Sequence, residues 1–253
     1  MPKRKRKPEV LTNSAPVSVP KHWLRANYHF HVFHYRMPDT VAIASVTPFV
    51  PSPLTVKMAL VASLLQSGDA ESAKQLAPLL PQIEVRIVPP PSAFSFKAFL
   101  RYRSVPAVES DGDLDESGSY YPSRPHTREY ALLEGEIIVF VGLPDKSILE
   151  IVKTALQRIR YLGCKDSLVT CRGVEEANED EVRESKTVQP LQESAHGSVI
   201  LGADFKGSVN IQLEDLIPAS RKDDHYLSPP PLFILPGKII VKARTRIFKR
   251  FEN

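Results

Sequence analysis

The chain has 253 residues, of which 42% are hydrophobic and 25% are charged, with a formal net charge of +4. This composition suffices for a buried core and excludes a wholly disordered chain. No run of about 18 apolar residues occurs, and no apolar stretch follows the basic N-terminus, so neither a transmembrane helix nor a signal peptide is indicated. We expect a globular, cytoplasmic protein that does not contact a membrane.

The charges are concentrated in blocks. Residues 3–7 are basic, and residues 1–20 lack a hydrophobic period, so they are expected to form a disordered basic tail that tethers nucleic acid. Residues 3–7 also resemble a nuclear import signal. Residues 109–116 and 175–184 are acidic and are expected to form mobile loops.

The first half of the chain predicts a strand, a helix and a second strand. Residues 23–35 alternate as a first strand, and residues 40–49 form a second extended stretch. Ser52 is a good N-cap before Pro53, so a helix should begin there and end at Gly68. After a connector at Pro78 and Pro81, residues 83–88 alternate strictly and predict a strand.

The second half repeats this order after a long insertion. Residues 94–102 and 120–130 predict two weak extended arms, joined by an acidic loop. Residues 136–141 are almost continuously apolar, as in a central strand. A helix is expected from residues 143–145 to Gly163, followed by a strand that begins at residues 168–170.

Two successive strand–helix–strand units predict an α+β, ferredoxin-like (RRM-like) domain. We expect this domain over residues 21–175, with an insertion at about 89–130, and an acidic linker and β-rich C-terminal region over residues 176–253. Within that region, residues 198–201 and 209–213 are prone to form strands. In a final strand from 238 to 250, basic residues alternate with apolar ones, so one face could follow a phosphate backbone.

Each candidate binding feature has a structural alternative. The basic strand face could instead protect a sheet edge from aggregation. Ser52, Thr55 and Lys57 surround a helix N-terminus that could bind phosphate, or that is simply capped. Basic and aromatic residues alternate on the two arms of the insertion. This pattern favours binding of single-stranded RNA, but a flexible surface hairpin would have the same composition.

Histidines are the other candidate chemical groups. His22, His29, His31 and His34 lie close together in sequence, but no nearby cysteine or carboxylate completes a metal site. One of them could act as a general base for RNA cleavage, although no partner is identified. Cys164 and Cys171 fit no common zinc or redox spacing, so they are expected to be ordinary thiols, and no cofactor is expected.

Two segments carry a resemblance to a known family. They are VTPFVPSPLTVKMALVASLL at residues 46–65 and RIRYLGCKDSLV at residues 158–169, which flank the long insertion. Their order and separation resemble the fifth CRISPR-associated (Cas) protein family, of the RAMP superfamily, over about residues 25–175. The chain departs from the common pattern in its basic N-terminal extension and in the diverged insertion.

The resemblance implies a non-catalytic subunit of a type I Cascade surveillance complex, which acts in antiviral defence. Such a subunit caps the five-prime handle of the CRISPR RNA. Its inserted thumb hairpin, here residues 89–130, reaches a Cascade backbone subunit of the RAMP type, the Cascade large subunit docks on the other side, and target DNA is engaged indirectly. Some members also process precursor RNA with a tyrosine, lysine and histidine set, which does not map onto this sequence residue by residue.

The expected RNA-binding residues combine the resemblance with side-chain type and position. They are Ser52, Thr55, Lys57, Arg101, Arg103, Arg128, Arg158, Arg160, Lys165, Lys242, Arg244 and Arg246. Two other functions stay open. One is a metal-independent endoribonuclease that uses a histidine with Tyr28, Tyr35 or a lysine, and the other is a general single-stranded nucleic-acid binding module.

Overall fold

The computed structural model describes residues 22–35, 46–103, 123–193, 196–216 and 223–252. The predictions for the basic tail, for most of the extended stretch at 40–49, and for the acidic segment 109–116 lie outside these residues.

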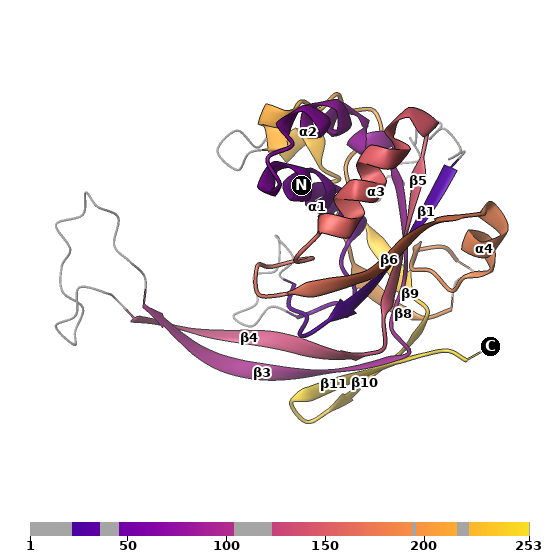
Figure 1. The fold of residues 1–253 in the computed structure, drawn as a ribbon. Coiled ribbons are helices and arrows are strands. Elements are labelled where there is room, and N and C mark those ends of the chain that lie inside the picture. Colours follow the sequence, from indigo (N-terminus) through magenta and orange to yellow (C-terminus); the bar gives the residue numbers. More distant parts are fainter. Residues whose placement is uncertain (1–21, 36–45, 104–122, 194–195, 217–222, 253) are drawn as a thin grey trace, which may run out of the picture.

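A four-stranded antiparallel sheet forms the centre of the molecule (Figure 1). Its strands are β1 (His22–Phe30), β2 (Glu84–Val88), β5 (Ile137–Leu143) and β6 (Val169–Ala177), in the order β2-β5-β1-β6. With helices after the first and third of these strands, this is the ferredoxin-like order, so the predicted fold class is confirmed. The apolar β5 lies inside the sheet between β2 and β1, as its composition indicated.

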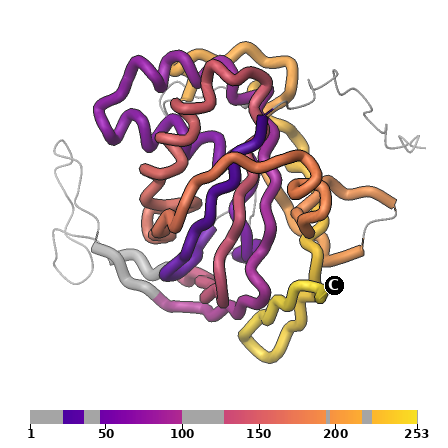
Figure 2. Tube along the Cα trace, turned by 45° about the vertical axis from the view of Figure 1, so that its right-hand side comes forward, coloured from indigo at the N-terminus to yellow at the C-terminus, as the bar shows by residue number. Residues whose placement is uncertain are grey.

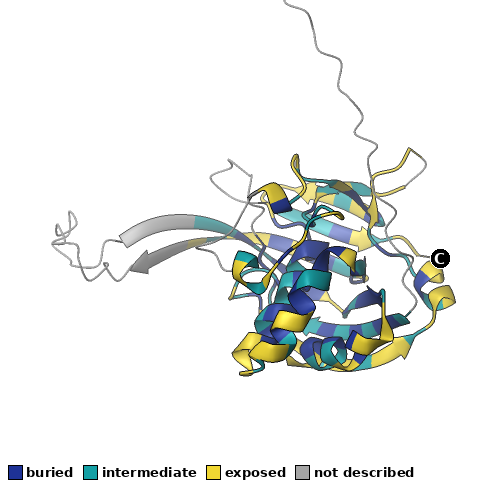
Figure 3. Ribbon diagram, turned by 90° about the horizontal axis from the view of Figure 1, so that it is seen from above, coloured by how far each residue is buried: buried dark blue, intermediate teal, exposed yellow. Residues whose placement is uncertain are grey.

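Two main helices cover one face of this sheet. They are α1 (Pro53–Gln66) and α3 (Leu149–Arg158), which is preceded by the short turn η2 (Lys146–Ile148). The Ser63 hydroxyl at their contact donates to Ala155 O at 2.9 Å. Figure 3 shows the buried residues gathered where the helices meet the sheet, with exposed residues on the outer helix surfaces.

The helix boundaries differ in part from the prediction. α1 begins at Pro53 as expected, because the Ser52 side chain accepts from Thr55 N. A further helix α2 (Ala70–Leu76) and a 3-10 turn η1 (Ala77–Gln82) fill the expected connector, since Asp69 caps α2. α3 ends at Arg158, five residues before Gly163, because the chain turns into an extended conformation at Ile159.

The opposite face of the sheet is covered by a second small cluster. Trp23, Val88 and Phe140 pack there against Val182 of α4 (Glu179–Glu184). The acidic residues 175–184 are therefore not a loop, as was expected, but the end of β6 and this helix. Its N-terminal carboxylates suit the positive end of the helix dipole, and the Asn178 side chain accepts from Glu181 N at 2.8 Å.

A long hairpin leaves the body between β2 and β5. β3 (Ser92–Arg103) and β4 (Ser123–Glu134) pair in register from Ser92 opposite Glu134 to Arg103 opposite Ser123, which confirms the two extended arms. The hairpin projects to one side of the molecule (Figures 1 and 2). The inner face of its base packs on the core through Ala93, Ala131 and Leu133.

The C-terminal strands extend the hairpin into a second sheet, in the order β10-β11-β3-β4. β10 (Gly237–Lys242) and β11 (Thr245–Arg250) are two strands, so the prediction of one strand over 238–250 is wrong. The chain reverses at residues 243–244, where Ala243 has a φ of 51°. As a result, Arg246 and Arg250 lie on the opposite face from Lys238 and Lys242.

The C-terminal region also contributes to a third, small sheet. It consists of β7 (Gln189–Pro190), β9 (Leu232–Leu235) and β8 (Ser198–Leu201), in that order. The expected strand at 198–201 is β8, but 209–213 is not a strand and leads into η3 (Leu213–Leu216), followed later by η5 (Asp223–His225). Among the helices of the described residues, none has the length and apolarity that crossing a bilayer requires.

Candidate nucleic-acid interface at the hairpin base

The second sequence motif forms a closed loop between α3 and β6, which we call the α3–β6 loop (residues 159–168). Val169 N donates to Arg160 O at 2.9 Å, and Leu162 N donates to Ser167 O at 3.2 Å. These bonds bring the two ends of the loop together. The exposed side chains of Arg160 and Lys165 are thereby held on a defined backbone.

This loop is fixed to the segment that follows β1. Ser167 Oγ donates to His34 O at 2.5 Å and accepts from His34 N at 2.8 Å, while Cys164 N donates to His34 O at 3.3 Å. Gly163 has a φ of +106°, and an added Cβ would lie 3.0 Å from His34 O. The motif therefore contains a glycine because the backbone conformation and the close approach both require it.

A buried carboxylate joins the first motif to the hairpin base. Glu129 of β4 is 2% exposed, and its carboxylate accepts from Thr47 N at 2.7 Å and from Ser95 Oγ at 2.6 Å. Arg246 Nε of β11 lies 3.5 Å from the same carboxylate. The backbone carbonyl of Glu129 also accepts from His34 Nδ1 at 2.8 Å, which places the proton on that ring nitrogen. We call Glu129, Thr47, Ser95, Arg246 and His34 the Glu129 network.

Arg246 has a structural position in this network and is not free to bind RNA, which corrects the prediction for this residue. Its side chain is 17% exposed, donates from Nη2 to Thr47 O at 2.6 Å, and lies over the Phe49 ring at 4.8 Å. Burial lowers the pKa of the Arg246 guanidinium, and the Glu129 carboxylate opposes this shift. The two motifs, about 100 residues apart in sequence, thus meet at the hairpin base.

An ion pair also joins the hairpin to the α3–β6 loop. Arg128 Nη1 donates to Asp166 Oδ2 of the α3–β6 loop at 3.0 Å, and the Tyr130 hydroxyl lies 3.0 Å from the same oxygen. Arg128 is only 33% exposed. Arg158 at the end of α3, and Arg160 and Lys165 in the α3–β6 loop, are exposed, and no ion pair is found for them among the described residues.

The hairpin continues this basic region away from the body. Arg101 and Arg103 lie on β3, opposite Pro125 and Ser123 of β4. The Arg128–Asp166 pair thus joins the hairpin base to the loop that carries Arg160 and Lys165 and that follows Arg158, and Arg101 and Arg103 lie farther out on the same hairpin.

The start of α1 does not offer a phosphate site, contrary to the prediction for Ser52, Thr55 and Lys57. Ser52 is 5% exposed, and its hydroxyl contacts Thr55 N at 3.4 Å and the Tyr35 hydroxyl at 3.0 Å. Leu54 N donates to Ala203 O at 3.0 Å, so a protein carbonyl already occupies this end of the helix. The Lys57 side chain is 3% exposed and pairs with Asp204 at 2.7 Å.

The remaining two predicted residues lie elsewhere. Lys242 and Arg244 are exposed at the β10–β11 turn. Among the described residues, no hydrogen bond or ion pair joins them to the α3–β6 loop.

Three of the groups considered for catalysis are buried in the fold, whereas His31 is exposed, with its Nε2 3.3 Å from Thr170 Oγ1. The Tyr28 hydroxyl is fully buried, donates to Leu156 O at 2.7 Å, and has a pKa raised well above its ordinary value, first by burial and then by Cys171. Tyr35 contacts Ser52, and His34 is buried against Glu129. Within the described ranges, no group of three or more histidine, cysteine or acidic side chains could hold a metal ion, and Cys164 and Cys171 form no disulfide.

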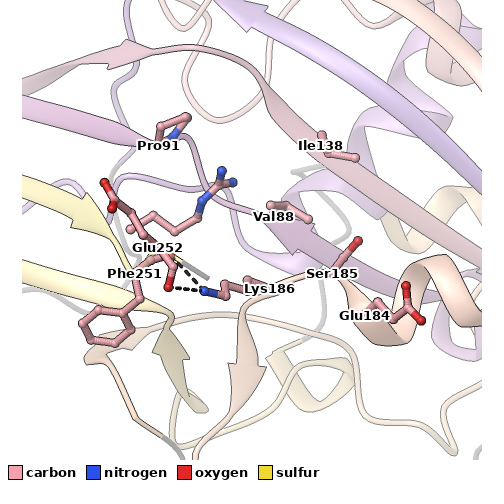
Figure 4. Close-up of a pocket in the computed structure, with 9 residues that line it drawn as sticks. Val88, Pro91, Ile138, Glu184, Ser185, Lys186, Phe251 and Glu252 are labelled. Carbon is pink, nitrogen blue, oxygen red and sulfur yellow. Dashed lines mark hydrogen bonds between the residues drawn. The ribbon is translucent and has the colours of Figure 1, made fainter.

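A separate hollow of about 470 Å³ lies near the C-terminal end of β11 (Figure 4). Val88 and Ile138 line one side. Lys186 points toward the end of the chain and donates to Phe251 O at 3.1 Å and to Glu252 O at 2.7 Å. Lys186 thus fixes the C-terminal residues, and Arg250 in the same hollow donates to Pro89 O at 2.8 Å.

Sequence reasoning missed the carboxylates that organise this region, which are Glu129, Asp166 and Asp204. Each resembles an ordinary surface acid in sequence. One signal was present for Lys57, the partner of Asp204: it lies on the apolar stripe of α1 between Leu54 and Val61 and is therefore expected to be buried with a counter-ion.

Comparison with known proteins found one relevant relative. No protein-family model matches the chain. It is 24% identical over 159 residues to the CRISPR-associated protein Cas5 of Archaeoglobus fulgidus, and the match covers 62% of this chain and 66% of the relative, just under two thirds of its length.

Two solved structures were also matched. One is a crystal structure of a CRISPR protein from Archaeoglobus fulgidus, with 11% identity, a TM-score of 0.41, and 91% and 92% of the two chains covered. The other is a chain of a CRISPR RNA-guided surveillance complex, with 15% identity, a TM-score of 0.42, and 84% and 88% covered. The strand order described above, rather than these overlays, defines the ferredoxin-like fold. On the sequence match, the chain is homologous to the CRISPR-associated protein Cas5 of Archaeoglobus fulgidus.

Proposed function

We propose that this chain is a non-catalytic RNA-binding subunit of a type I Cascade complex, and that it caps the five-prime handle of the CRISPR RNA. The observation that carries the proposal is the group of exposed cations at the hairpin base, in a homologue of Cas5. Arg160 and Lys165 belong to a loop that is fixed by Ser167 and His34, and Arg158 ends the helix before it, so the backbone that carries the charges that would meet phosphate is held in place before RNA binds.

The handle would lie across the α3–β6 loop and continue along the hairpin, where Arg101 and Arg103 follow. Arg128 already pairs with Asp166, so it would serve mainly to join the loop to β4. The hairpin tip would then reach a backbone subunit of the RAMP type, with the large subunit on another side of the body, and target DNA would be engaged through the assembled complex.

A binding role is favoured over ribonuclease chemistry that uses Tyr28, Tyr35 or His34. A general base needs a positioned partner within hydrogen-bond reach of the substrate. The hydroxyls of Tyr28 and Tyr35 are buried and already bonded to protein groups, and His34 Nδ1 donates to a backbone carbonyl.

The test is RNA binding by the purified chain, measured by fluorescence anisotropy with a labelled RNA of repeat-derived handle sequence. Replacing Arg158, Arg160 and Lys165 by Ala should weaken binding by at least about tenfold. It should also lower the slope of log Kd against log salt concentration by about two to three, because up to three phosphate contacts are lost. The control replaces exposed Lys74, Lys146 and Arg172, which removes the same charge elsewhere. Equal loss in both variants would contradict the site, and cleavage of unprocessed repeat RNA in EDTA would assign a nuclease instead.

A further inference from the structure

The outer face of the hairpin sheet carries an apolar row that nothing described covers. Register places Ile240, Ile247, Phe94 and Leu132 side by side across β10, β11, β3 and β4, on the face opposite the buried Ala93 and Phe248. Phe94 is 39% exposed and Ile240 is 36% exposed. In Figure 1 this sheet lies along the lower side of the molecule, at its periphery.

Lysines border this row on the β10–β11 side. Lys238 and Lys249 form a cross-strand pair on one side of the row, and Lys242 lies on the other side, two residues along β10 from Ile240. All three are exposed, and the described residues provide no ion pair for any of them. We call the apolar row with these lysines the lysine-rimmed face.

A hollow of about 440 Å³ lies at the same place. It is bounded by Phe94, Ile247, Thr245, Lys249 and Glu134, among others. The face is therefore indented where the row crosses from β11 to β3.

We propose that the lysine-rimmed face docks a protein surface with an apolar centre and acidic residues around it. An apolar centre with a charged rim is the arrangement of protein interfaces. Two lysines placed opposite one another on a strand pair repel, so an occupant that supplies carboxylates between them relieves that repulsion as well as covering the row. This surface is distinct from the RNA site, and the inference does not depend on the proposed function.

The side chains favour protein over nucleic acid as the occupant. Three of the four residues in the row are aliphatic, whereas bases stack on planar rings. The nearby Phe96 ring is already stacked against Tyr130, with centroids 5.9 Å apart and an interplanar angle of 24°. The cations lie only at the β10–β11 end of the row, and β3 and β4 add none beside Phe94 and Leu132.

The test is site-specific photo-crosslinking in the complex that forms when the full chain is co-expressed with its genomic neighbours. Phe94 is replaced by p-benzoylphenylalanine, and Ile240 in a second variant in case the first does not assemble. The expected result is a light-dependent adduct with one other protein, through a peptide in which Asp or Glu lies within four residues of the attachment point. Leu65, 43% exposed on α1, is the matched control position and should not give this adduct.

Charge reversal separates docking from accidental contact. Lys238→Glu with Lys249→Glu should reduce the adduct yield by at least about tenfold, whereas Lys74→Glu with Lys146→Glu should leave it unchanged. An adduct with RNA or with a second copy of this chain, no adduct from either position, or a yield that is unaffected by the reversal would overturn the proposal.

Discussion

Removing the Glu129 carboxylate should loosen the whole hairpin base. Glu129→Ala deprives Thr47 N and the Ser95 hydroxyl of their acceptor and leaves the Arg246 guanidinium without its buried counter-ion. Removing one partner of a buried ion pair costs about 3–5 kcal/mol, because the other charge stays buried and uncompensated. We expect a loss of about this size in the free energy of unfolding.

Urea denaturation followed by tryptophan fluorescence measures this loss. Trp23 is the single tryptophan, and it lies on the back of the central sheet, 5% exposed, with the Arg86 guanidinium 5.5 Å from its ring. Glu129 lies outside its cluster, so the substitution does not alter the probe directly. Glu193→Ala, in an exposed part of the chain, is the control and should change stability by less than about 0.5 kcal/mol.

A double-mutant cycle isolates the ion pair. Arg246→Ala in the Glu129→Ala background should cost less than it does alone, with a coupling of about 1–3 kcal/mol. A loss below about 1 kcal/mol for Glu129→Ala, or additivity within about 0.5 kcal/mol, would refute the reasoning that this pair fixes the hairpin.

Three further predictions concern single residues. Lys57→Ala should cost about 1–3 kcal/mol in a denaturant titration, because it removes the cation 2.7 Å from Asp204, which is 24% exposed and keeps its bond from Phe205 N. Gly163→Ala should lower the thermal midpoint, because its φ of +106° disfavours a side chain and the added Cβ meets His34 O. The pKa of Tyr28 is raised in the folded state, so the unfolded chain loses this proton first, at a pH of about 10. Stability should therefore fall as pH rises above about 10, and Tyr28→Phe should make that fall shallower. An unchanged midpoint for Gly163→Ala, a loss below about 1 kcal/mol for Lys57→Ala, or an identical alkaline slope for Tyr28→Phe would each contradict its argument.

The ferredoxin-like core was predictable because its signals are local. The Ser52–Pro53 start of α1 needs only a cap and a proline, and the strand patterns of 83–88 and 136–141 need only their own side chains. The order of these elements then leaves few topologies. The missed α2 has a short polar sequence that forms a helix chiefly because Ala73 and Leu76 pack on the core.

The candidate site was only partly predictable, because exposure depends on tertiary contacts. Arg158, Arg160 and Lys165 resemble Arg246 and Lys57 in sequence, yet the first three reach solvent and the last two pair with buried or half-buried carboxylates. The turn at Ala243 has neither glycine nor proline, so the sequence gives no signal that the strand ends there. The alternating pattern was therefore continued through the turn, and Arg246 was assigned to the wrong face.

The most direct test of the capping role is to sequence the RNA that co-purifies with the full chain after co-expression with its genomic neighbours and a CRISPR array. The account predicts CRISPR RNAs that share one five-prime end, and loss of this RNA in the Arg158, Arg160 and Lys165 triple alanine variant. Bound RNA with heterogeneous five-prime ends, or a shared end that the triple variant retains in full, would contradict it.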